Sequence, residues 1–147
     1  MKKCLVFVSL VLFGCATTQT LKTPSGKPEF TFYKVQRKEL ANAILNRMIT
    51  KGYSVKQVTD YTIVMRKAET GILTGALFGS RYDSTPERRI TFTFVEVDSG
   101  IRTIIADQIV TNPGSAFEKI TEMDGGKASG QEQDFLQAIS DSLTGKK

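Results

Sequence analysis

The sequence contains no histidine, the side chain that enzymes use most often as a general base and proteins use most often as a metal ligand. It also lacks long basic stretches. Lys and Arg outnumber Asp and Glu by 20 to 15, but they occur singly or in pairs and never in a run of five. Scattered charge of this kind is typical of a solvated surface, so we expect no nucleic acid partner.

Two segments in the last third of the chain resemble a phosphate-binding loop and a calcium-binding loop but lack the residues or spacing that these sites require. Gly125 to Lys127 is followed by Ala128, where a phosphate-binding loop needs Ser or Thr. Glu118, Glu122 and Asp124 do not alternate as the ligands of an EF-hand calcium loop do. We interpret these acids as surface charges near turns, and we predict neither a metal ion nor a cofactor.

The first residues have the layout of a secretory signal peptide. Lys2 and Lys3 form a basic start, and Cys4 to Phe13 is a nearly uninterrupted apolar run that ends before Gly14. The run is too short to span a bilayer, which takes about 20 apolar residues. We expect residues 1–14 to be removed during export.

The end of this stretch, Leu12-Phe13-Gly14-Cys15, resembles a lipobox, the motif cut by the bacterial lipoprotein signal peptidase. The resemblance implies that the Cys15 thiol carries a diacylglycerol and that this lipid holds the chain in a membrane. Cys4 lies in the removed segment, so no second cysteine remains for a disulfide within the mature chain. The alternative is an ordinary signal peptide that happens to contain a cysteine.

The residues after Cys15 bear on the destination of the chain. Ala16 and Thr17 follow it, with no aspartate directly after the cysteine. In enteric-type bacteria this resembles the pattern of lipoproteins sent on to the outer membrane, and it implies a domain that faces the periplasm. Residues 15–28 are rich in Thr, Ser, Gly, Pro and Lys and predict a flexible tether that spans roughly 20 Å. Residues 29–147 then form one domain.

The first half of this domain predicts one helix and two strands. Phe30 to Val35 is either a short edge strand or the approach to a helix. Gln36 to Lys51 is a helix, followed by Gly52 as a residue that can take the left-handed conformation. Its apolar stripe consists of Leu40, Ala41, Ile44, Leu45, Met48 and Ile49. Tyr53 to Val58 and Tyr61 to Lys67 follow as strands, with Tyr61, Ile63 and Met65 on one face.

The second half predicts a hairpin and a closing helix. Arg89 to Val97 has Ile90, Phe92 and Phe94 on one face, and Ile101 to Thr111 returns beside it with an expected β-bulge at Ile104-Ile105, where the alternation slips. Ser115 to Gly130 is expected to be a loop. Ser129 and Glu132 have the spacing of a capping box before a helix whose apolar stripe is Phe135, Leu136, Ile139 and Leu143.

These elements predict an α+β domain of two layers, in which an antiparallel sheet of about four strands packs against two helices. The layout is similar to the helix-grip or TATA-binding-protein-like domains of some envelope lipoproteins, such as a lipoprotein subunit of the β-barrel assembly machinery. The likeness concerns topology alone, so it implies a fold and transfers no binding site.

An apolar segment from Gly71 to Gly79 lies inside the longest expected connection, with glycine at every fourth position. It can fold back on the core as a short helix, contact a partner or a membrane, or act as a lid over a small ligand. We predict it as the candidate interaction loop, formed by Ile72, Leu73, Leu77, Phe78 and Arg81. Arg81, together with Arg88 and Arg89, would suit an anionic lipid or an acidic partner.

The sequence therefore favours a non-enzymatic envelope lipoprotein whose domain binds an envelope protein complex or the membrane surface. The alternative is a carrier of a small ligand or lipid in the groove between helix and sheet, and a hydrolase ranks third. A buried apolar cavity of several hundred Å³ would favour the carrier. A solid core beside an exposed apolar surface would favour the interaction domain.

Overall fold

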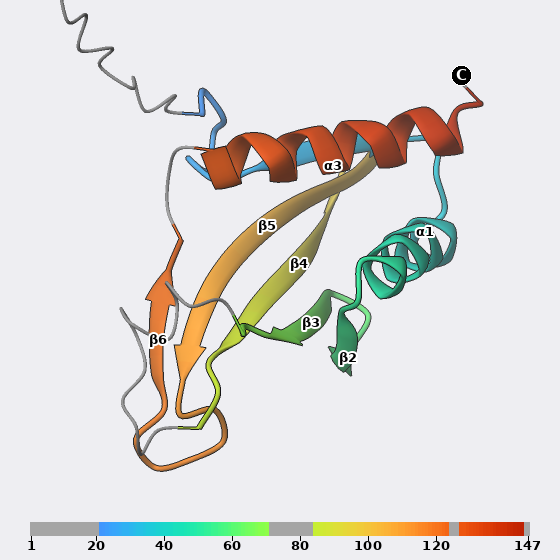
Figure 1. Cartoon of the computed structure of the whole chain (residues 1–147). Coiled ribbons are helices and arrows are strands. Elements are labelled where there is room, and N and C mark those ends of the chain that lie inside the picture. Colours follow the sequence, from blue (N-terminus) through green and yellow to red (C-terminus); the bar gives the residue numbers. More distant parts are fainter. Residues whose placement is uncertain (1–20, 71–83, 124–126, 146–147) are drawn as a thin grey trace, which may run out of the picture.

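The structure is a computed structural model, and it describes residues 21–70, 84–123 and 127–145. In this part of the chain one antiparallel sheet packs against two helices, which confirms the predicted α+β class. The sheet has six strands instead of about four. Figure 1 shows α3 lying across the strands and α1 beside β2 and β3.

The chain order is β1, α1, β2, β3, β4, β5, β6, α3. The strands are β1 Glu29–Tyr33, β2 Ser54–Val58, β3 Thr62–Ala68, β4 Glu87–Val97, β5 Gly100–Thr111 and β6 Lys119–Glu122, and the helices are α1 Arg37–Thr50 and α3 Lys127–Leu143. The sheet order is β1-β5-β4-β3-β2. β1 pairs with the first half of β5 and β6 with its end, so these two short strands share one edge of β5.

Helix α1 forms where the apolar spacing predicts it. Leu40, Ile44 and Met48 recur every fourth residue and are buried. Lys51 is the C-cap, and Gly52 takes the left-handed conformation with a φ of 84°, as expected of the residue after a helix. The same apolar core includes Phe135, Leu136 and Ile139 of α3, so both helices cover one face of the sheet.

Phe30 to Val35 was open to two interpretations, an edge strand or the approach to a helix. The structure has a strand there, β1. Phe32 is buried in the core and Phe30 packs against it. Its neighbour β5 begins at Gly100, where an added Cβ would lie 2.4 Å from the carbonyl oxygen of Phe32. Glycine is therefore needed there for the close approach of two backbones, in addition to its role in the hairpin turn.

The predicted bulge at Ile104-Ile105 is wrong. The β4–β5 register runs without a shift from Glu87↔Val110 to Val97↔Gly100. The alternation only seems broken in the sequence because Thr103 and Asp107 occupy buried, helix-facing positions of β5. Among the described strand pairs, the register shifts instead in β2, between Val55 and Gln57.

Two further expectations are wrong in the last third of the chain. β6 forms within the segment that was expected to be a loop, and it pairs with β5 from Thr111↔Lys119 to Gln108↔Glu122. Helix α3 begins at Lys127, so Ser129 and Glu132 lie inside its first turns and do not form a capping box. Tyr61 also departs from the predicted face, because it is 64% exposed while Ile63 and Met65 are buried.

Candidate functional site

The residues predicted as the interaction loop lie outside the described part of the chain. This applies to Ile72, Leu73, Leu77, Phe78 and Arg81, and it also applies to the predicted lipidation site, Cys15.

The two arginines expected beside that loop are on β4, where they point to opposite faces of the sheet. Arg88 lies on the helix-covered face and binds Asp107, while Arg89 is 9% exposed on the other face and binds Glu87 and Glu118. Both guanidinium groups already have carboxylate partners within the domain. Of the three arginines expected to suit an anionic lipid or an acidic partner, Arg88 and Arg89 are therefore engaged inside the domain, and Arg81 lies outside the described residues.

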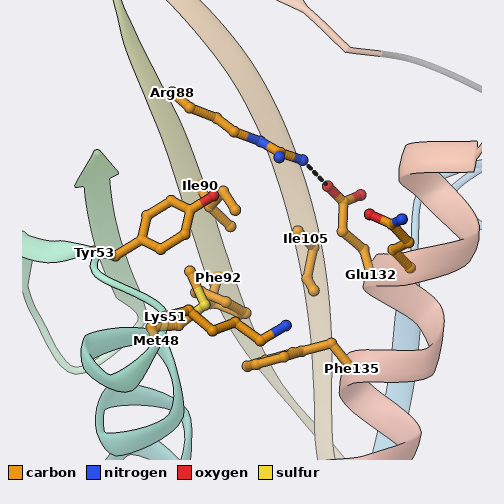
Figure 2. A pocket seen from close by; sticks show the side chains of 10 residues that line it. Met48, Lys51, Tyr53, Arg88, Ile90, Phe92, Ile105, Glu132 and Phe135 are labelled. Carbon is orange, nitrogen blue, oxygen red and sulfur yellow. Dashed lines mark ion pairs between the residues drawn. The ribbon is translucent and has the colours of Figure 1, made fainter. Parts of the chain in front are cut away.

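A cluster of three charged side chains joins α3 to the sheet. Arg88 on β4 and Asp107 on β5 are diagonal neighbours, because Ile90 is the direct partner of Asp107. Arg88 Nε donates to Asp107 Oδ1 and Oδ2 at 2.9 and 3.0 Å, and Nη2 donates to Oδ2 as well. Glu132 reaches the pair from α3, with Oε1 3.6 Å from Arg88 Nη2 (Figure 2).

Glu132 has a raised pKa in this cluster. Burial raises the pKa of Glu132 to about 8, and a hydrogen bond to Asp107 that only the protonated carboxyl can donate adds to the rise. The hydrogen bonds to Asp107 hold the pKa of Arg88 above its ordinary value. Glu132 is thus neutral at neutral pH, beside the hydrogen-bonded Arg88 and Asp107. Glu132 Oε1 is buried and accepts no hydrogen bond.

A cavity of about 80 Å³ lies next to this cluster, between the sheet, the end of α1 and the first turns of α3. Figure 2 shows its lining, which consists of Met48, Lys51, Tyr53, Arg88, Ile90, Phe92, Ile105, Gln131, Glu132 and Phe135. Ile90 and Phe92 of β4 and Ile105 of β5 form an apolar floor. Burial raises the pKa of the Tyr53 phenol, so this hydroxyl stays neutral at physiological pH.

A shallow, open groove of about 530 Å³ continues from the cavity between the two helices. Lys51, Gln131 and Phe135 line both spaces. The groove is completed by Arg47 of α1 and by Asp134 and Ala138 of α3. Lys51 Nζ lies 5.3 Å from the centre of the Phe135 ring, at the junction of groove and cavity.

A second charged cluster stabilises the opposite face of the sheet. Arg89 Nη2 and Nε donate to Glu87 Oε1 at 2.7 and 3.1 Å, and Arg89 Nη1 donates to Glu118 Oε1 at 3.0 Å. Glu118 also accepts from the backbone N–H of Gly114, and its pKa is lowered chiefly by the hydrogen bond from Arg89. These contacts join β4 to the turn between β5 and β6, which makes this cluster a structural one.

The described residues contain no group of three or more Cys, Asp or Glu side chains able to hold a metal ion. Among them, no helix is long and apolar enough to cross a membrane. No protein-family model, no curated protein and no solved structure matches this chain.

Sequence reasoning missed the two buried acids beside the cavity, Asp107 and Glu132. The sequence pattern predicts a bulge at Ile104-Ile105 and assigns no face to Asp107, which follows in the same strand. Glu132 was interpreted as part of a helix cap. The signal available in the sequence was an acid at a core position of a strand, which needs a buried partner wherever it occurs.

Proposed function

We propose that this chain is a lipid-anchored protein of the bacterial cell envelope, attached through Cys15, whose domain binds an envelope protein partner and catalyses no reaction. The strongest support for this proposal is the lipobox-like segment Leu12 to Cys15, which follows a basic start and a short apolar run. We further propose the outer membrane as its location, with the domain in the periplasm, because no aspartate follows the cysteine.

The described domain supports an interaction role better than a carrier role. The cavity between helices and sheet holds about 80 Å³, whereas sites for small molecules commonly enclose 300–1,000 Å³. An acyl chain does not fit into that space. The adjoining groove is larger but open, as expected of a surface that contacts another protein.

The alternative function is a carrier that uses the space between helix and sheet. The same small cavity restricts the ligand of such a carrier to a very small molecule. An apolar cavity of about 150 Å³ binds benzene, so about 80 Å³ leaves room only for a smaller group. Such a carrier would bind short organic acids and not lipids.

The anchor is tested by metabolic labelling with an alkyne fatty acid, followed by washing of the membranes with carbonate. We expect label on the wild-type chain and none on Cys15→Ser, which should be released into the soluble fraction because its lipid is missing. Cys4→Ser is the matched control, since Cys4 lies in the segment expected to be removed. A Cys15→Ser chain that stays in the washed membranes would refute the lipid anchor.

Location and partner are tested on the same cells. Sucrose-gradient fractionation should place the wild-type chain with outer-membrane markers, and recovery with inner-membrane markers contradicts the proposed location. Chemical crosslinking in intact cells should give one discrete higher-mass species that contains the chain. A chain that crosslinks to nothing under conditions that crosslink known envelope complexes contradicts the interaction role.

A further inference from the structure

We propose that the cavity and the groove between α1 and α3 form one binding site for a peptide segment of the partner. This segment inserts a short aliphatic side chain into the cavity and places a carboxylate beside Lys51. The inference rests on the proposed function, because it names the surface and the chemistry by which the domain binds its partner.

The size of the cavity selects the inserted group. About 80 Å³ is too little for an aromatic ring system or an acyl chain but suits the three or four carbons of a branched aliphatic side chain. The floor is formed by the buried side chains Ile90, Phe92 and Ile105, so the inserted group must be apolar. Met48 at the wall has a flexible side chain that adapts to different shapes.

The charged side chains in and around the site favour a ligand that carries a carboxylate. Asp107 is neutralised by Arg88, and Glu132 is held in its protonated form by burial and by Asp107. In the described part of the chain neither Lys51 nor Arg47 takes part in an ion pair. The α1 side of the groove is thus basic and open to an anion, with Asp134 as the single acid on the α3 side.

The continuity of the two spaces indicates a peptide as the ligand. Lys51, Gln131 and Phe135 line both the cavity and the groove, so a chain lying in the groove passes directly over the cavity mouth. Lys51 Nζ lies over the Phe135 ring at this junction. A carboxylate next to the inserted side chain, such as a peptide C-terminus, would meet this ammonium group.

The test uses the full chain with Cys15→Ser and a pentapeptide of alternating glycine and serine that ends in leucine with a free carboxylate. Binding is followed by amide chemical shifts in two-dimensional NMR at pH 7. We expect saturable shifts centred on Lys51, Gln131 and Phe135. The same peptide with a C-terminal amide, or with glycine in place of the leucine, should bind at least about fivefold more weakly, because each lacks one of the two recognised features.

Variants of the protein locate the carboxylate. Lys51→Glu should weaken binding by about tenfold, since repulsion replaces attraction at an exposed site. Lys38→Glu is the matched control, because this exposed lysine lies at the other end of α1. Equal losses in both variants would mean unspecific charge attraction and would overturn the site.

Two other results also overturn the inference. If 4-methylpentanoate alone produces the same shifts with equal affinity, the groove contributes nothing and the ligand is a small acid. If the leucine peptide produces no shifts around the cavity, the site does not bind this chemistry. Neither result affects the labelling of Cys15 or the crosslinking in cells, so failure of this site and failure of the proposed function are distinguished.

Discussion

Glu132 makes the stability of this domain depend on pH in a direction opposite to that of most carboxylates. The side chain is 7% exposed, and its Oε1 lies 3.6 Å from Arg88 Nη2 beside Asp107. Burial and Asp107 raise the pKa of Glu132 from 4.5 to about 8 in the folded chain. In the unfolded chain the carboxyl is exposed and regains its ordinary pKa.

The sign of the effect follows from proton counting. Between pH 4.5 and pH 8 the folded state holds a proton on Glu132 that the unfolded state has lost, so rising pH favours unfolding. The contribution of this group is fully present below pH 4.5 and is lost as pH rises through about 8. Because each pH unit corresponds to about 1.4 kcal/mol, the total loss amounts to a few kcal/mol.

The substitution Glu132→Gln removes this titration while keeping a neutral side chain that can donate a hydrogen bond to Asp107. We expect the free energy of unfolding of the variant to match that of the parent chain near pH 4 and to exceed it by a few kcal/mol near pH 9. The assay is urea unfolding followed by circular dichroism in steps of half a pH unit.

Other carboxyl groups do not obscure this comparison. The pKa values of Glu118 and Glu122 are lowered by hydrogen bonds, so these groups add stability that is lost in acid, but they do so equally in both proteins. Glu39→Gln, on the exposed surface of α1, is the control and should leave the pH profile unchanged. Parallel profiles for Glu132→Gln and the parent between pH 4.5 and 8 would refute the reasoning about the buried acid.

Further predictions concern two glycines, one ion pair and the predicted loop. Gly100→Ala should lower the free energy of unfolding by about 1–3 kcal/mol, because its Cβ would lie 2.4 Å from a carbonyl oxygen of β1. Gly130→Ala, with open space around it inside α3, should raise it by about 0.8 kcal/mol, and urea titrations that reverse this order contradict the backbone argument. Arg89→Met should cost about 3 kcal/mol because it leaves Glu87 buried without its main partner, and a loss below about 0.5 kcal/mol in the same assay would show that the pair is solvated. Leu77→Asp should lower the melting temperature if the Gly71–Gly79 segment packs on the domain, or weaken binding to partner or liposomes at unchanged melting temperature if the segment is a contact surface; no effect on either makes it a passive linker.

The sequence predicts well where burial follows a simple period. Leu40, Ile44 and Met48 mark α1 because residues four apart share one face of a helix. Ile90 and Phe92 mark β4 because alternate residues of a strand share one face. Both patterns are local, so a single sequence is enough to reveal the α+β class and the layering of helices on a sheet.

Two short strands, β6 and β1, do not follow from local spacing because their pairing with β5 decides them. β6 has four residues, all but one of them exposed, and it exists as a strand through pairing with the end of β5. β1 is also short, and its Phe30 and Phe32 gain their burial from β5 and the helices. Such pairing depends on contacts between segments far apart in the chain, which apolar spacing within one segment does not encode.

The candidate site was hidden for a related reason. An acid in a strand normally marks the solvent face, and the residue spacing of β5 does not assign Asp107 to the buried one. The register shows that it faces the helices, where burial without a partner would be costly. Arg88, on the neighbouring strand β4, offsets that cost by binding Asp107. The two residues meet only because β4 pairs with β5.

Glu132 is a buried acid on the helix side of this cluster, and its charge also has to be compensated or removed. If Glu132 were ionised, the cluster under α3 would carry a net negative charge. Protonation of Glu132 avoids this charge but leaves its acceptor oxygen Oε1 without a hydrogen bond. A well-packed leucine at position 132 would remove this penalty, as replacement of buried polar groups by apolar ones often does. Because the carboxyl lies at the wall of a cavity whose rim includes Lys51, its neutral state also leaves the positive charge of the rim uncompensated. The same proton therefore lowers the electrostatic cost of packing α3 on the sheet and keeps the rim attractive to an anionic group.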